Sequence, residues 1–326
     1  MKAMILAAGF GTRLFPLTVD RTKPAIPFLG KPLVGYVAEY LSKFGFNEVI
    51  VNLHHQPESV KTALGDGSRF GVKIHYALED PRILGTAGAL WNAREFLQNE
   101  TFLVINGKIV TDIDLTAAVT AHRKSDVIAT MVLKENARSE KFTEIITENN
   151  LVKGFGSFPE PIQSKPENAP LMFTGIQILE PAVFDYIPPN QESDIISVFY
   201  RPALAGGVSI AAHITTGDWY ELSTIKRYLD ISLAMRAGAE LIQGKDCQIA
   251  AEANVTDSVL WNNVQIAAGA AVSRCVVGDN VTINAGDKFE NAAIVRANLV
   301  SGQEIPAKAL PGALQGDNYV VPLGLS

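Results

Sequence analysis

The chain has 326 residues, of which 47% are hydrophobic and 19% are charged. This composition can fill one large core or two unequal ones, and it excludes an intrinsically disordered chain. The formal net charge of -6 leaves no general basic field for nucleic acid, so any bound phosphate must be held locally. The two cysteines do not form a disulfide framework. No segment reaches the ~20 apolar residues that span a bilayer, and we expect a cytoplasmic protein without a membrane partner.

The first half of the chain predicts alternating strands and helices. Short apolar runs predict the strands, and apolar residues three and four positions apart predict the helices. The predicted strands are Lys2–Ala7, Glu48–Leu53, Val72–Ala77 and Phe102–Ile105, and the predicted helices are Leu33–Phe44, Pro57–Leu64 and Ala87–Leu97. This order predicts a Rossmann-like α/β sheet, mixed but mostly parallel, with helices on both faces. Ligands of such a sheet bind beyond the carboxyl ends of its strands.

The pattern becomes more β-like between residues 126 and 216. Four further strands are predicted there, and a proline- and glycine-rich stretch between them predicts a loop or lid. The strands are Val127–Leu133, Phe142–Glu148, Thr174–Leu179 and Val208–Ile214, and the loop is Gly154–Pro170. A helix over Ser223–Ala237 is expected to close a first domain that spans residues 1–240.

The remaining residues, 245–326, have a different repeat. Apolar residues recur six positions apart, with one step of five and with turn-forming residues between them. They are Leu260, Ile266, Val272, Val277, Ile283, Phe289 and Val295. This spacing indicates a short left-handed hexapeptide β-helix, with an ordinary antiparallel meander as the alternative. Because a few coils bury little surface by themselves, we expect this module to pack on the first domain or on another subunit.

A glycine-rich turn follows the first predicted strand directly. The string is Leu6-Ala7-Ala8-Gly9-Phe10-Gly11-Thr12-Arg13-Leu14-Phe15-Pro16-Leu17-Thr18. Glycines let backbone N–H groups approach a phosphate closely, and Arg13 adds a permanently charged donor. Lys23, in Thr22-Lys23-Pro24, supplies a second cation. The string is neither a Walker A loop nor the Gly-x-Gly-x-x-Gly dinucleotide fingerprint.

These strings resemble the sugar-1-phosphate nucleotidyltransferases, and the hexapeptide tail is similar to that of their mannose-1-phosphate guanylyltransferase and glucose-1-phosphate adenylyltransferase branches. The resemblance continues at Leu84-Gly85-Thr86-Ala87-Gly88-Ala89, Val51-Asn52-Leu53-His54-His55, Thr174-Gly175-Ile176 and the Trp219 segment. It implies that a sugar-1-phosphate attacks the α-phosphate of an NTP, which gives an NDP-sugar and pyrophosphate, with Mg²⁺ bridging the phosphates. Positioning and charge neutralisation would supply the rate, since no covalent nucleophile is needed.

The resemblance also implies roles for individual residues. Arg13 and Lys23 would be catalytic, with Arg13 stabilising charge on the α- and β-phosphates and Lys23 holding the α-phosphate. The nucleotide would be bound by Ala7, Ala8, Gly9, Gly11, Thr12, Arg13, Gly85, Thr86 and Asn106, and the sugar by Gly175 and Ile176. The nucleobase and the sugar are not specified by these strings.

Three departures from the family pattern concern the metal and the sugar. Asn106-Gly107-Lys108 stands where the family has Asn-Gly-Asp, and an ammonium repels a metal ion. Glu221 stands where the second metal-binding aspartate is expected, one methylene further out. The family's Glu-Lys-Pro is missing from Phe155–Pro161, although Lys165-Pro166 is nearby. Asp112 or Asp114 could take over the metal, or Lys108 could occupy the metal position as a tethered cation.

Two functions are therefore open. The first is a nucleotidyltransferase that acts on an NTP and a sugar-1-phosphate, with slow turnover or altered metal use. The second is a catalytically impaired paralogue that binds nucleotide or NDP-sugar and regulates a partner subunit. In either case the β-helix could support a homo-oligomer or a regulatory hetero-oligomer. Acyl transfer through the β-helix is disfavoured, because no histidine follows His213 to act as a base.

Overall fold

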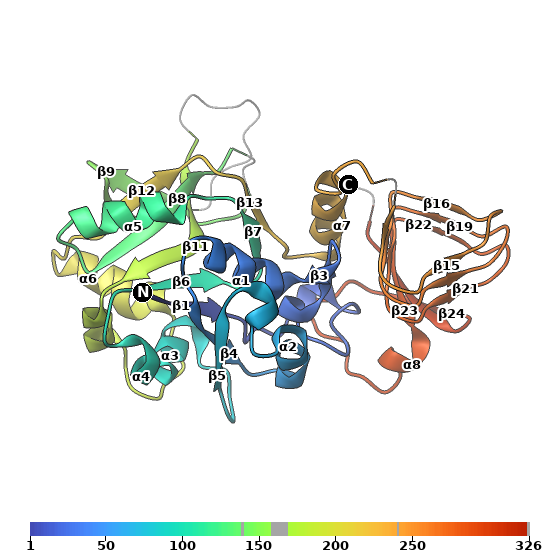
Figure 1. The fold of residues 1–326 in the computed structure, drawn as a ribbon, viewed down its shortest axis with the longest axis horizontal. Helices are drawn as coiled ribbons and strands as arrows, with labels where there is room; N and C mark the ends of the chain where they lie inside the picture. Colours follow the sequence, from blue (N-terminus) through green and yellow to red (C-terminus); the bar gives the residue numbers. More distant parts are fainter. Residues whose placement is uncertain (138–139, 158–168, 240, 325–326) are drawn as a thin grey trace. The chain divides into compact units, whose positions relative to one another are not determined.

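The computed structural model describes residues 1–137, 140–157, 169–239 and 241–324 (Figure 1). The predicted loop Gly154–Pro170 lies largely outside these residues, as do Pro159–Pro161 and Lys165-Pro166. Two compact units are present: residues 1–8, 37–54 and 64–219 form unit 1, and residues 9–36, 55–63 and 220–326 form unit 2. No helix in the described ranges has both the length and the apolar character needed to cross a membrane.

A mixed nine-stranded sheet forms the centre of unit 1, in the order β5-β4-β1-β6-β11-β8-β12-β10-β9. Its strands are β1 (Lys2–Leu6), β4 (Glu48–Leu53), β5 (Lys73–Leu78), β6 (Phe102–Asn106), β8 (Ala129–Glu135), β9 (Ile145–Glu148), β10 (Leu151–Phe155), β11 (Leu171–Leu179) and β12 (Ala211–Thr215). The first four in spatial order are mutually parallel, and β12 runs parallel to β8. The remaining pairs are antiparallel. The expected mixed α/β sheet is confirmed.

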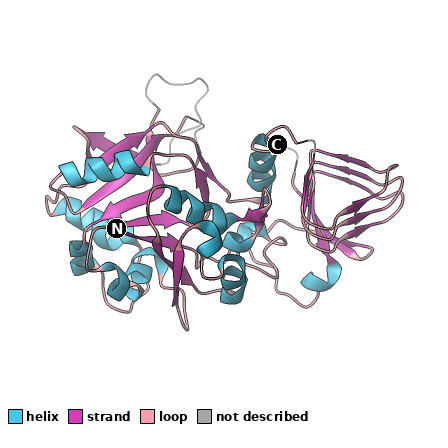
Figure 2. Ribbon diagram, viewed as in Figure 1, coloured by secondary structure: helices cyan, strands magenta, loops and turns pink. Residues whose placement is uncertain are grey.

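Helices cover both faces of this sheet, as Figure 2 shows. Side chains alternate between the faces of a strand, so Met4, Val104 and Met131 lie on one face, where α3 (Gly85–Asn92) and α4 (Arg94–Leu97) join them in one core. On the other face, His122 of α5 (Leu115–Lys124) is hydrogen-bonded to the hydroxyl of Thr130 at 2.8 Å. The expectation of a two-faced sheet is thereby confirmed.

The helices differ from the predicted ones in several places, among them two short helices over Arg201–Ala205 and Ala297–Val300 that the sequence did not predict. The helix predicted over Ala87–Leu97 is two helices, because the chain leaves helical geometry at Ala93. The sequence pattern also missed α5, which begins after Asp114, whose carboxylate accepts the N–H groups of Thr116 and Ala117. An aspartate followed by apolar residues is a helix-start signal that was present in the sequence. The remaining helices of the two units are α1 (Leu33–Lys43), α2 (Pro57–Leu64), α6 (Arg201–Ala205), α7 (Ile225–Ala234) and α8 (Ala297–Val300).

Parallel strands in three sheets form the β-helix of unit 2. The first sheet contains β14 (Ile242–Gln243), β17 (Val259–Leu260), β20 (Val276–Val277) and β23 (Ala292–Arg296), extended by the antiparallel strands β25 (Asn318–Pro322) and β24 (Ala313–Gln315). The second contains β15 (Gln248–Ile249), β18 (Gln265–Ile266) and β21 (Thr282–Ile283). The third contains β16 (Asn254–Thr256), β19 (Ala271–Ser273) and β22 (Lys288–Glu290). The predicted β-helix is confirmed, and the meander is excluded.

Each coil of the β-helix has 17 residues, because paired positions such as Asn263 and Asn280 are 17 residues apart. The step of five in the sequence is therefore a regular part of each coil. Six of the seven predicted apolar residues lie in the buried core of the coils, and Ile294 takes the seventh place in it. Val295 is also buried, but outside that core. The repeat continues by five from Phe289 to Ile294, where the sequence pattern had assumed six.

Candidate functional site

Strand β1 ends in the middle of the parallel part of the sheet, where Leu6 is in register with Asn52 of β4 and Asn106 of β6. Ala7 and Ala8 follow and are buried. The N–H of Ala7 donates to Oδ1 of Asn52 at 2.7 Å. Because this donor is already used within the protein, backbone donors for a phosphate are expected to begin at Gly9.

A buried carboxylate links the end of β1 to the next predicted loop. Nδ2 of Asn52 donates to Oε1 of Glu79 at 2.6 Å, and the N–H of Leu84 donates to Oε2 at 2.7 Å. Glu79 is 1% exposed. Burial raises the pKa of the Glu79 carboxyl, while the hydrogen bonds from Asn52 and Leu84 and the charge of His54 lower it. Glu79 therefore orients Asn52 on one side and the start of the Gly85 turn on the other.

We expect Asn52→Ala to lower the free energy of unfolding by roughly 2–5 kcal/mol, since it strands the Ala7 N–H and one oxygen of Glu79 without partners. Loss of the Asn52 hydrogen bond further raises the pKa of Glu79. A carboxyl with a raised folded-state pKa destabilises the fold above that pKa, and the penalty is relieved as the pH falls through it. The defect should therefore shrink as the pH falls from neutrality towards the ordinary pKa of a glutamate, about 4.3.

Denaturant unfolding across this pH range measures the effect of Asn52→Ala. The matched control is Asn92→Ala, because Nδ2 of Asn92 donates to the carbonyl of Leu78 at 3.0 Å on the surface. This control is expected to change the free energy of unfolding by less than about 1 kcal/mol at either end of this pH range. A defect of Asn52→Ala that grows on acidification would contradict the role of Glu79.

The Gly85-Thr86 turn is held by a segment more than one hundred residues later. The hydroxyl of Thr86 donates to Oδ2 of Asp194 at 3.1 Å and accepts the N–H of Ile195 at 2.9 Å. Gly85 has a φ of +70°, and a Cβ there would lie 2.5 Å from the carbonyl oxygen of Ser193. The sequence analysis missed Ser193 and Asp194, which have no motif of their own. Gly85 thus has a backbone that only glycine adopts without strain.

Asn106 and Gly175 meet where β6 and β11 lie side by side. A Cβ on Gly175 would collide with Nδ2 of Asn106, and the φ of Gly175 is +79°. Trp219 closes this region, since its indole N–H donates to the carbonyl of Thr174 at 2.9 Å. The structure therefore brings together two of the predicted binding residues, Asn106 and Gly175. Ile176 is fully buried, and its N–H donates to the hydroxyl of Thr174 at 3.3 Å, so its role at the sugar stays a prediction.

The residues expected around the metal do not make a cation site of the family kind. Lys108 is half-buried in the turn between β6 and β7 (Ile109–Thr111). Asp112 accepts the N–H of Asp218 at 2.5 Å, and Asp114 caps α5, so both carboxylates already serve the backbone. Within the described ranges, no three His, Cys, Asp or Glu side chains are grouped for a metal. Mg²⁺ prefers oxygen ligands, and an ammonium at Lys108 does not fit it.

Glu221, the second expected metal residue, belongs to unit 2 and ends β13 (Trp219–Glu221). Its side chain is 5% exposed, and its carbonyl accepts the Nε–H of Arg227 at 2.8 Å. A carboxylate as enclosed as this one has little room for the water ligands that Mg²⁺ usually keeps. Its metal role stays a prediction.

The glycine loop itself lies in unit 2. Gly11 has a φ of +68° and begins a 3₁₀ turn over Thr12–Leu14, with the N–H of Leu14 donating to its carbonyl at 2.8 Å. The hydroxyl of Thr18 donates to the same carbonyl at 3.2 Å. A Cβ at Gly11 would lie 3.1 Å from Cβ of Lys23. The glycine turn and the predicted lysine are therefore side by side, with Arg13 exposed and Lys23 half-buried.

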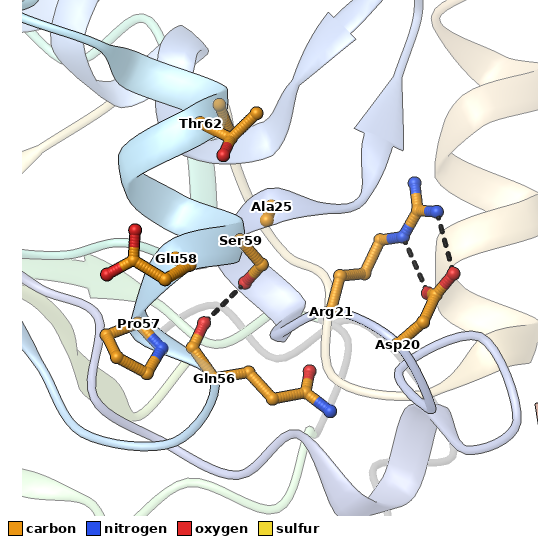
Figure 3. Close-up of a pocket in the computed structure, with 9 residues that line it drawn as sticks. Asp20, Arg21, Ala25, Gln56, Pro57, Glu58, Ser59 and Thr62 are labelled. Carbon is orange, nitrogen blue, oxygen red and sulfur yellow. Dashed lines mark hydrogen bonds and ion pairs between the residues drawn. The ribbon is translucent and has the colours of Figure 1, made fainter.

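An open cavity of about 610 Å³ is also present in unit 2. It is lined by Asp20, Arg21, Ala25 and residues 56–59, 62 and 63. Figure 3 shows Arg21 paired with Asp20 on one side and the first turn of α2 on the other. None of the predicted catalytic or binding residues is among those that line it, so this cavity is separate from the glycine turn.

Comparison with known proteins gives matches to two family profiles and to several sugar-1-phosphate nucleotidyltransferases. The family profile described as "Nucleotidyl transferase" matches residues 2–238, and that described as "GlmU-like, C-terminal hexapeptide" matches residues 238–302. A UTP–glucose-1-phosphate uridylyltransferase of Synechocystis sp. is 35% identical over 70% of the chain and 61% of its own length. The N-acetylmuramate α-1-phosphate uridylyltransferase of Neisseria meningitidis is 35% identical over 70% of the chain and 95% of its own length.

A solved structure agrees with these relatives. A Bacillus anthracis protein assigned as a glucose-1-phosphate thymidylyltransferase superposes with a TM-score of 0.63 and 25% identity, over 73% of this chain and 96% of that one. The chain covers less than two thirds of the Synechocystis relative. The family profile, in contrast, matches well over half of the present chain. This chain belongs to the nucleotidyl transferase family, whose members here are sugar-1-phosphate nucleotidyltransferases.

Proposed function

We propose that the protein transfers a nucleoside monophosphate from an NTP to a sugar-1-phosphate. A phosphate oxygen of the sugar-1-phosphate attacks the α-phosphorus, the bond between the α-phosphorus and the bridging oxygen breaks, and pyrophosphate leaves with the electron pair. The observation that carries the proposal is the glycine turn, whose left-handed Gly11 packs against Lys23 directly after the strand that ends at the centre of the sheet. A turn of this kind offers backbone N–H groups and a cation to one phosphate chain.

In this proposal the residues of unit 2 handle the triphosphate. Gly9, Gly11 and Thr12 cradle it, Arg13 stabilises the charge that develops on the α- and β-phosphates, and Lys23 holds the α-phosphate. The exposed position of Arg13 supports this role, since its guanidinium is accessible to a ligand. Arginine offers a planar fork of donors that matches phosphate oxygens. Catalysis would then come from positioning and charge stabilisation.

Residues of the nine-stranded sheet and its loops would select the two substrates. Gly85 and Thr86 would lie against the nucleobase, and Asn106 would bind the nucleotide beside the sugar site at Gly175 and Ile176. The clamp of Thr86 by Asp194 supports a rigid base pocket. The close packing of Asn106 against Gly175 supports the proposed sugar site, because a glycine is required at this position to leave room for the Asn106 side chain. Ala7 and Ala8 would contribute shape and backbone to the same site.

Arg13→Ala is expected to weaken NTP binding by about tenfold or more, because a charge-assisted contact is worth roughly 1.5–3 kcal/mol. Calorimetric titration with each of the common NTPs measures the effect. Arg123→Ala, at an exposed arginine of α5, is the control for loss of a surface charge. Equal affinities of Arg13→Ala and wild type for every NTP would remove the glycine turn as the phosphate site.

A second function, nucleotide or NDP-sugar binding by a catalytically impaired subunit that regulates a partner, is favoured by one observation. Lys108 stands where the family has a metal-binding aspartate, and Asp112 and Asp114 are engaged by backbone N–H groups. Either function could use the β-helix for assembly with copies of the chain or with the partner subunit.

Pyrophosphate release distinguishes the two functions. The wild-type protein is incubated with a panel of NTPs and sugar-1-phosphates, with and without Mg²⁺, and the same NTPs are titrated by calorimetry. Turnover with at least one pair supports the transferase. Nucleotide binding without turnover on any pair would leave the regulatory function, and absence of both would exclude the two proposals together.

A further inference from the structure

The compact unit that contains the β-helix also contains the glycine turn. Residues 9–36, with Arg13 and Lys23, are grouped with residues 220–326, whereas β1, which immediately precedes the turn, belongs to unit 1. The positions of the two predicted catalytic cations therefore depend on contacts with the β-helix. Named side chains make these contacts.

Arg21, two residues before Lys23, contacts the coils through its guanidinium group. Its Nη2 donates to Oδ2 of Asp279 at 2.6 Å, and its guanidinium lies 5.0 Å from the ring centre of Trp261. The side chains of Arg21 and Asp279 are 21% and 16% exposed. A shielded, charge-assisted pair of this kind is stronger than an ion pair on the open surface.

The coil orients its side of the contact. Oδ1 of Asp279 accepts the backbone N–H of Asn262 at 2.8 Å and its Nδ2 at 3.2 Å, so Oδ2 is left to face Arg21. Trp261 is 3% exposed, and its indole N–H donates to the hydroxyl of Tyr228 at 3.0 Å. The acceptor and the aromatic face are thus both held by groups other than Arg21.

Lys23 is anchored on its other side as well. The hydroxyl of Tyr228 donates to the carbonyl of Pro27 at 2.5 Å, four residues after Lys23. Between the two anchors, the N–H of Thr22 donates to Oγ of Ser59 at 3.2 Å. Arg21 also borders the cavity shown in Figure 3, next to Asp20. The backbone of Lys23 is consequently held before and after by contacts that originate in the β-helix and α7.

We propose that Arg21 and Asp279 are positioning residues through which the β-helix holds the glycine turn and Lys23 in place for the nucleotide. The inference rests on the proposed function, since Lys23 is expected to hold the α-phosphate. It gives the β-helix a part in substrate binding besides assembly. A displaced cation costs binding because a charge-assisted contact depends on its geometry.

The test uses the full chain and the variants Asp279→Asn and Arg21→Met, which remove the charge of one partner at nearly constant volume. Hydrogen exchange is measured without ligand, and NTP affinity is measured by calorimetry. We expect exchange of the amides in residues 11–26 to rise about tenfold, and the Kd for NTP to rise by about the same factor. The double variant should be no worse than Arg21→Met alone, because both substitutions remove the ion pair between Arg21 and Asp279.

The control is Arg274→Ala, which removes an ion pair of similar length between α7 and the β-helix, with side chains 39% and 38% exposed. Nη2 of Arg274 donates to Oδ1 of Asp230 at 2.7 Å, away from the glycine turn in sequence. It should leave exchange of residues 11–26 and the Kd within about twofold of wild type. Arg21→Lys, which keeps the charge, should restore part of the NTP affinity lost in Arg21→Met.

The possible outcomes separate this inference from the proposed function. Nucleotide binding by wild type, with unchanged exchange and affinity in both charge-removing variants, would overturn the inference alone. If wild type binds no NTP, the proposed function fails, and hydrogen exchange of the two variants still tests the positioning role. Faster exchange confined to residues 11–26 supports that role, and unchanged exchange overturns it. If Asp279→Asn does not fold, Arg21→Met, which leaves the bonds from Asn262 intact, decides in its place.

Discussion

Lys108→Asp is expected to raise Mg²⁺-dependent pyrophosphate release at least about tenfold above that of wild type, since a metal ion contributes several kcal/mol of charge stabilisation in such reactions. The substitution supplies a carboxylate where the resemblance to the family leads us to expect one, and it removes a charge that repels the cation. The gain should remain incomplete, because Glu221 keeps its longer side chain. The rates are measured side by side with a panel of NTPs and sugar-1-phosphates, over a range of Mg²⁺ concentrations.

Two controls separate the effect of the new carboxylate from the effect of losing a positive charge. Lys108→Ala removes the positive charge without adding a ligand, and it should not acquire the Mg²⁺ dependence of Lys108→Asp. Lys124→Asp, at an exposed lysine of α5, makes the same charge change elsewhere and should leave the rate near that of wild type. Strong wild-type turnover that Lys108→Asp abolishes would mean that the lysine itself contacts phosphate, and our interpretation of this position would be wrong.

Gly175→Ala is expected to destabilise unit 1 by about 2–5 kcal/mol and to remove most of the sugar-1-phosphate-dependent turnover. The left-handed φ of +79° costs an L-residue about 1–2 kcal/mol, and the collision of the new Cβ with Asn106 adds the roughly 1–3 kcal/mol of an overpacked site. Displacement of Asn106 would disturb the proposed nucleotide site at the same time. Denaturant unfolding and steady-state kinetics measure the two effects.

Three further variants resolve the two causes. Gly207→Ala has a similar φ of +77° with nothing within 4 Å of the new Cβ, so it should lose only about 1–2 kcal/mol, the cost of the backbone conformation. Gly154→Ala, without positive φ and with the same open space, should be nearly neutral. Asn106→Ala combined with Gly175→Ala should recover stability but not nucleotide affinity. A double variant as unstable as Gly175→Ala alone would show that the collision with Asn106 is not the cause.

Local pattern was sufficient for most of the secondary structure. The predicted helix Pro57–Leu64 is α2, and the predicted strand Glu48–Leu53 is β4, with the same bounds. Pro57–Leu64 begins with proline and has helical spacing of its apolar residues, whereas Glu48–Leu53 is a short continuous apolar run. Helix α5 was missed although Asp114 caps it, because half of its residues are polar and its apolar stripe is narrow. Hydrophobic periodicity alone did not identify α5, and the capping aspartate was needed as a second signal.

The β-helix could also be predicted, because its core is built from a repeat that is visible in one dimension. The residue that was misplaced was Val295, and the reason is that the step of five recurs once in every coil of 17 residues. A single step of five cannot be distinguished from an irregularity when only two coils are visible in the sequence. Residues of positive φ at Asp257, Arg274 and Asn291, one per coil, mark the corner at which it occurs.

The sequence by itself determined the glycine turn, the two cations beside it and the order of strands that leads to them, because each of these is encoded by neighbouring residues. Only the tertiary structure decided which distant side chains fix the end of β1, the Gly85 turn and the segment that contains Lys23. Asn52 and Glu79 are 27 residues apart, Thr86 and Asp194 are 108 apart, and Arg21 and Asp279 are 258 apart. Polar contacts of this kind leave no period in the sequence, since each depends on one pair of atoms brought together by packing elsewhere.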